Sequence, residues 1–122
     1  VLKFNMSATN YYLSKGYTPI NKNIIISGPD TISIWAPVTG NRVILTEMNI
    51  TANQAGTIVF IFYDQLAANY FAQFSLAAST TIAPSIGCVQ GTMLSGSLFA
   101  RTLGNSTNGW NINLTGFEDG AI

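Results

Sequence analysis

Short apolar runs separated by turn residues recur along most of this chain, and the runs alternate with a period of two residues. β-Branched and aromatic residues fill the runs, whereas Gly, Pro, Asn and Ser stand between them, which is typical of strands. No segment keeps a sustained helical period, although residues 64–72 have room for one helical turn. The pattern predicts about eight strands in an all-β chain, with the clearest at 23–27, 31–36, 42–52, 57–63, 69–77, 97–103 and 110–116.

The longest run, residues 42–52, changes its apolar phase near its middle. Val43 and Leu45 share one face, but Met48 and Ile50 fall on the opposite parity. One extra residue restores a single inward face, because each one-residue shift moves every later side chain to the other side of the sheet. The sequence therefore predicts a β-bulge near residues 46–47.

Alternation also predicts which aromatic rings face the core. Trp110 shares its face with the apolar residues of its strand and is predicted to lie in the core. Trp35 shares parity with Thr31 and Ser33 and is therefore expected at the surface. Tyr70 is placed on the same face as the apolar residues of the run at 69–77.

The run at 57–63 is apolar on both faces. Such a strand is typical of the middle of a sheet that is covered on both sides. Together, the runs predict an antiparallel sandwich or barrel around a single core. One face of this strand belongs to that core, so the other face needs a partner subunit or a covering loop.

Residues 1–21 lack clean alternation and are interpreted as an extended N-terminal arm, with room for one short strand, ahead of a sandwich domain at 22–122. A tyrosine ring with its polar hydroxyl suits an interface. Docking onto a neighbouring subunit and folding back onto the same domain are both open interpretations. The candidate partner-binding residues of the arm are Leu2, Phe4, Tyr11, Tyr12 and Tyr17.

Charge is scarce, because only 8% of the residues are charged, and the chain has no histidine. Histidine is the side chain best suited to titrate near neutral pH, so acid–base catalysis has few candidates. Glu118 and Asp119 are adjacent in sequence and would point apart on a strand. No motif for a metal, phosphate or nucleophile is present, and we predict a protein that is not an enzyme and has no cofactor.

Other ligand classes are also disfavoured. The five Lys and Arg residues are scattered along the sequence, so no basic patch that would bind nucleic acid is predicted. No apolar run reaches the roughly 18 residues of a membrane span, so no membrane association is predicted. The single cysteine, Cys88, is expected to be a small buried residue.

The segment from Ala36 to Ala52, the strand from Gly56 to Asp64 and the closing strand from Asn111 to Glu118 resemble small β-sandwich proteins of tailed bacteriophages. The resemblance covers roughly residues 30–119. It lies in the order of the strands and in the general residue pattern of strands and turns rather than in a diagnostic motif. The resemblance implies a capsid decoration, or cement, protein or a related minor virion protein, with a jelly-roll-like fold.

This resemblance implies a structural virion protein on the capsid surface. Its members often form homotrimers that bridge neighbouring subunits of the phage major capsid protein, often with an N-terminal arm, and they have no catalytic residues to transfer. The alternative is a receptor- or carbohydrate-binding sandwich of a tail fibre or secreted protein, in which an exposed Trp35 stacks on a sugar.

Overall fold

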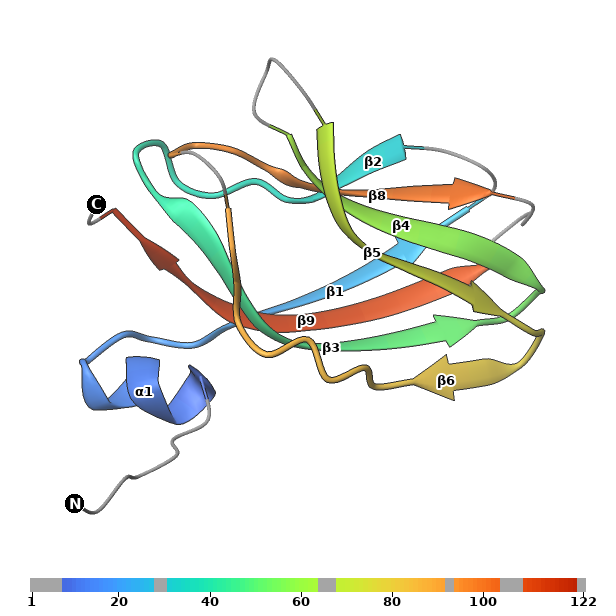
Figure 1. Ribbon diagram of the computed structural model, residues 1–122, viewed down its shortest axis with the longest axis horizontal. Coiled ribbons are helices and arrows are strands. Elements are labelled where there is room, and N and C mark those ends of the chain that lie inside the picture. Colours follow the sequence, from blue (N-terminus) through green and yellow to red (C-terminus); the bar gives the residue numbers. More distant parts are fainter. Residues whose placement is uncertain (1–7, 28–30, 64–67, 92–93, 104–108, 121–122) are drawn as a thin grey trace.

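The computed structural model describes residues 8–27, 31–63, 68–91, 94–103 and 109–120, and these form two antiparallel sheets packed face to face beside one short helix (Figure 1). The first sheet has the strand order β1-β9-β3-β6, with β7 also paired to β3, and the second has the order β2-β8-β4-β5. The elements are α1 (Ala8–Ser14), β1 (Ile20–Ile26), β2 (Thr31–Trp35), β3 (Arg42–Ala52), β4 (Gly56–Tyr63), β5 (Ala68–Leu76), β6 (Thr80–Ile82), β7 (Val89–Gln90), β8 (Leu98–Leu103) and β9 (Trp110–Asp119).

The strands pair in a nested order. β1 pairs with β9, β2 with β8, β3 with β6 and β7, and β4 with β5, all antiparallel. This is the pairing of one long hairpin rolled into two layers, in which β6 and β7 act as one interrupted strand. The predicted all-β, jelly-roll-like sandwich of about eight strands is confirmed.

The main core fills the space between the two sheets. Trp35, Phe60 and Trp110 are its largest fully buried side chains, and Ile112 and Leu114 follow Trp110 along the inner face of β9. Each such side chain contributes about 1.5–3 kcal/mol when it leaves water. The inward orientation predicted for Trp110 is confirmed.

The bulge predicted in β3 is also confirmed. The pairing of β3 with β9 slips between Leu45 and Glu47, and Thr46 is the extra residue. Leu45 and Met48 are consequently both buried in the main core. The Thr46 hydroxyl donates a hydrogen bond to the Thr115 carbonyl at 3.1 Å, which satisfies a polar group that is only 7% exposed.

Two further bulges overturn two predicted orientations. The pairing of β2 with β8 slips between Ser33 and Trp35, so Trp35 turns inward and is 1% exposed. In β5, Ala72 pairs with Phe60 while Tyr70 pairs with Ile61, so the register slips at this point. Tyr70 is therefore 66% exposed instead of facing the core.

The arm was predicted to be extended, but residues 8–14 form the helix α1. Gly16, with φ of 87°, ends the helix in a left-handed conformation, and its N–H donates to the Leu13 carbonyl. The Tyr17 N–H donates to the Tyr12 carbonyl, and the two rings meet edge to face. This is a Schellman cap with its usual apolar contact, and glycine is the residue that adopts this φ without strain.

The segment at 78–91, where the sequence analysis placed no strand, contains the short strands β6 and β7. Both strands pair with β3 and so extend the first sheet, β6 with three residues and β7 with two. Within the described parts of the chain, no helix is long and apolar enough to cross a membrane.

Candidate functional site

Helix α1 packs on the outer surface of the first sheet through a small aromatic cluster. Tyr12 stacks on Phe117 with ring centroids 5.1 Å apart, Ile44 completes the buried contact, and Tyr17 packs at its side. The arm therefore contacts its own sandwich through Tyr12 and Tyr17. Tyr11 is 48% exposed on the other side of α1, and the predicted contact residues Leu2 and Phe4 lie outside the described residues.

The Tyr12 hydroxyl joins α1 to β7. Gln90 donates a hydrogen bond to this hydroxyl at 3.1 Å. Burial raises the pKa of Tyr12, and the nearby Cys88 thiol raises it further. Cys88 was expected to be buried, but it is exposed. Its surroundings still desolvate the sulfur enough to raise the pKa of the thiol, although its hydrogen bond with Tyr12 acts in the opposite direction.

Trp35 is buried and hydrogen-bonded, so its ring offers no surface on which a ligand could stack. Its indole N–H donates a hydrogen bond of 3.0 Å to Glu118, whose other oxygen accepts hydrogen bonds from the Val38 N–H and the Asn41 amide. Because the ring is only 1% exposed, it cannot stack on a saccharide in this structure. The expected exposure of Trp35 was wrong, since alternation alone does not register the bulge in β2.

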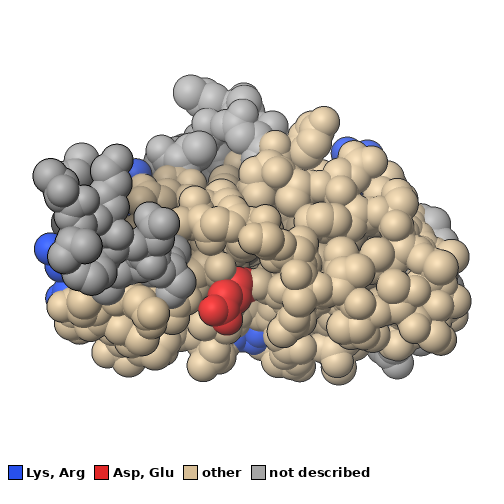
Figure 2. Space-filling model, turned by 60° about the horizontal axis from the view of Figure 1, so that its bottom comes forward, with Lys and Arg blue, Asp and Glu red and all other residues tan. Residues whose placement is uncertain are grey.

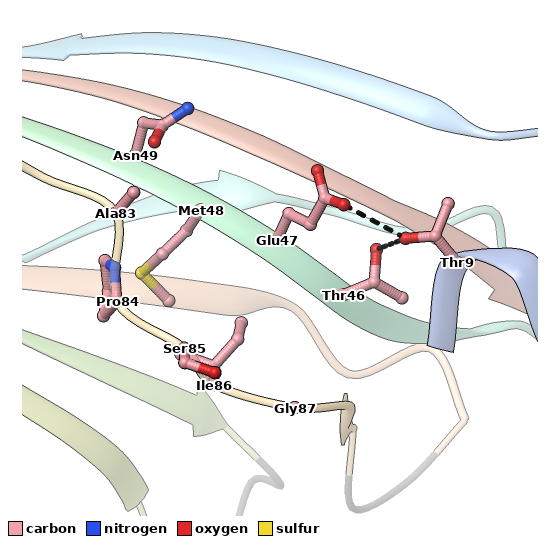
Figure 3. A pocket seen from close by; sticks show the side chains of 10 residues that line it. All are labelled: Thr9, Thr46, Glu47, Met48, Asn49, Ala83, Pro84, Ser85, Ile86 and Gly87. Atoms are coloured by element: carbon pink, nitrogen blue, oxygen red, sulfur yellow. Dashed lines mark hydrogen bonds between the residues drawn. The ribbon is translucent and has the colours of Figure 1, made fainter. Parts of the chain in front are cut away.

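A hollow of about 460 Å³ lies along β3 at the bulge (Figure 3). β7 pairs with Ile44 and Leu45, and β6 pairs with Ile50 to Ala52, but no strand pairs with residues 46–49 on this edge. The connection through residues 83–87 runs beside β3 and forms the opposite wall. Sequence reasoning missed this hollow, because it depends on which strands lie side by side.

Polar groups gather at one end of this hollow. Thr9 of α1 donates toward the Thr46 hydroxyl at 3.2 Å and toward a Glu47 carboxylate oxygen at 3.4 Å. Met48 and Pro84 supply apolar surface at the other end, where the Met48 side chain points toward the connecting segment (Figure 3). The hollow therefore combines one carboxylate with hydroxyl groups and an apolar wall, and its volume is in the usual range for ligand sites.

A smaller hollow of about 320 Å³ lies on the outer face of the second sheet. Ile61 is buried at this face, whereas Tyr70 and Leu103 stand exposed at 66% and 43%. Three further residues complete its lining: Val59, Gln73 and Arg101. We call these six residues the outer apolar face. This is the second face of the strand that the sequence predicted to be apolar on both sides.

Charges are few on the face that Figure 2 shows. One acidic patch lies on a mostly uncharged surface, with basic side chains beside the patch and at the edges of the view. Within the described ranges, no three His, Cys, Asp or Glu side chains lie close enough together to hold a metal ion. The chemistry available at both hollows is therefore hydrogen bonding and apolar contact, with one charged group in each.

No protein-family model matches this chain, and no curated protein matches its sequence.

Proposed function

We propose that this protein is a structural virion subunit that decorates a phage capsid and stabilises it by bridging neighbouring major capsid subunits. In this proposal it acts without a cofactor, as a homotrimer on the capsid surface. The observation that carries the proposal is the outer apolar face, which leaves Tyr70 and Leu103 exposed on a sheet. Exposed apolar patches on a soluble domain mark sites of association.

Two other features support this function. Viral capsid domains are one of the classes built on jelly rolls, although the fold by itself does not decide function. The formal net charge of zero gives little electrostatic protection against self-association. Multivalent attachment also lets modest contacts from several copies add up on a lattice.

Light scattering after gel filtration tests the self-association step. We expect a native mass near three times the 13.1 kDa of the chain. Replacing both Tyr70 and Leu103 with Ser should lower this mass, because their contact area leaves the interface. Ile25→Thr is the matched control, since Ile25 is 59% exposed on β1 of the other sheet. A monomer in the unchanged protein, together with no co-sedimentation with capsids that lack it, would overturn the proposal.

The alternative function, a receptor- or carbohydrate-binding module, was predicted from an exposed Trp35 that stacks on a sugar. Trp35 and Trp110 are both buried, whereas Tyr70 is exposed on the outer apolar face. Saccharide binding that is abolished by Tyr70→Ser, measured on a glycan array with a monomeric protein, is the result that would favour this alternative.

A further inference from the structure

The open edge of β3 has the features of a site for an added strand. Residues 46–49 lack a partner on this edge, although strands are paired on both sides of them. Six residues, 83–88, span the distance that four residues cover on β3, so the connecting segment leaves the hollow beside the strand. Unpaired backbone N–H and C=O groups at a strand edge are a template for another extended chain.

The side chains around this gap define what such a strand must carry. Met48 points inward and is 3% exposed, whereas Glu47 and Asn49 are exposed on the outer side. Neighbouring strands place like-facing side chains next to one another. An added strand therefore needs apolar residues on one face and polar residues on the other.

Glu47 adds a charge requirement. Among the described residues, its carboxylate accepts one hydrogen bond, from Thr9 at 3.4 Å, near the limit for such a bond, and no described Lys or Arg forms an ion pair with it. A positively charged side chain on the polar face of the added strand would complement it.

We propose that residues 1–7 of a second copy of this chain occupy the gap as a strand beside β3. Their sequence, Val-Leu-Lys-Phe-Asn-Met-Ser, alternates with Leu2, Phe4 and Met6 on one side and Lys3 and Asn5 on the other. A four-residue gap spans roughly 13 Å, so about four of the seven residues lie beside β3, between β7 and β6, and the others lead out of the gap. Lys3 supplies the cation that the site requires.

We take a second copy as the donor because the proposed function already requires self-association. Residues 1–7 precede Ala8, the first residue of α1, and Thr9 forms part of the wall of the hollow, so the segment joins the fold at one end of the gap. Donation from one copy to the next is a head-to-tail contact, which forms a ring such as a trimer when the rotation between copies closes. The inference thus rests on the proposed self-association and adds its contact.

Disulfide trapping between two full-length chains tests this inference. In a Cys88→Ser background, one chain carries Asn5→Cys and the other carries Asn49→Cys, and the two are mixed and oxidised. We expect a covalent dimer with a 5–49 linkage, identified by peptide mass spectrometry. The matched control replaces Asn49→Cys with Ile25→Cys, an exposed position on β1 that should give at least tenfold less dimer.

Each result decides the question. A second experiment places Asn5→Cys and Asn49→Cys in the same chain. A 5–49 link that forms only in this double variant overturns donation between copies. If no link forms in the double variant or in the mixture of two chains, the strand site is wrong. Charge provides an independent test: Lys3→Glu should slow trapping about two- to fivefold, as expected for an exposed ion pair, and Glu47→Lys in the partner chain should restore the rate.

This inference and the proposed function fail in different ways. If the native mass is trimeric and depends on Tyr70 and Leu103 while trapping fails, the strand site is wrong and the proposed function stands. If trapping succeeds but the protein does not bind capsids, the strand site stands and the proposed function is wrong.

Discussion

The indole N–H of Trp35 donates a hydrogen bond to Glu118 across 3.0 Å, which joins the end of β2 to the end of β9. The two residues are 83 positions apart in the chain, and the bond fastens the two sheets to each other at one end of the sandwich. Trp110, the other tryptophan, is equally buried, but its indole nitrogen has no hydrogen-bond partner among the described residues. This contrast leads to the first prediction.

Trp35→Phe and Trp110→Phe should differ in their effects on stability. Trp35→Phe removes a hydrogen bond to a carboxylate, so the free energy of unfolding should fall by about 2 kcal/mol. Trp110→Phe removes a buried donor that is already unsatisfied, so its loss should stay within about 1 kcal/mol. Urea denaturation of both variants measures the difference. Equal losses would show that ring volume, rather than the hydrogen bond, dominates at both positions.

Glu118 should make the stability depend on pH. Burial raises the pKa of Glu118, but the hydrogen bonds from Trp35, Val38 and Asn41 and the positive charge of Lys22 outweigh it, so the net pKa lies below the usual value of 4.5. A lowered carboxyl pKa contributes stability above pH 4.5, and this contribution disappears as the pH falls through the lowered value. Glu118→Gln should therefore cost about 1 kcal/mol at pH 7 and almost nothing at pH 2, as measured by urea titrations at several pH values. A cost that does not change with pH would contradict this explanation.

Gly116 should tolerate no side chain. A Cβ at this position would overlap the Ile44 carbonyl oxygen of the adjacent strand and would press on the Trp35 ring at 3.0 Å. Gly116→Ala should therefore lower the free energy of unfolding by about 2–3 kcal/mol. Gly91→Ala is the matched control, because its Cβ would meet Val43 at an ordinary 3.5 Å. Comparable thermal unfolding midpoints for the two variants would contradict the prediction.

Tyr12 should hold α1 on the sandwich without supporting the main core. Its ring belongs to the small cluster with Ile44 and Phe117, separate from the core between the sheets. Tyr12→Ala should remove hydrogen-exchange protection from residues 9–17 and leave β3 protected, because local units open independently of the global core. Leu13→Ala, at a position that is 45% exposed, should change little. Loss of protection throughout β3 would show that α1 is part of the same folding unit.

The sequence by itself determined the class of fold, the main inward faces and one irregularity. The two-residue period defined most of the strands, and the phase change between Leu45 and Met48 predicted the bulge at Thr46, because a strand with one buried face must keep its apolar residues on that face. Gly16 was also a readable signal for the end of a helix, although α1 itself was missed because seven residues are too few to show a helical period.

Tertiary structure decided the rest. Trp35 fitted the polar face by alternation, and only the pairing of β2 with β8 turned it inward, where Glu118 satisfies its N–H. The gap beside residues 46–49 arises because β6 and β7 approach β3 from a connecting segment two residues longer than the stretch it spans. Such features depend on contacts between residues far apart in sequence, and no local pattern of hydrophobic and polar positions contains them.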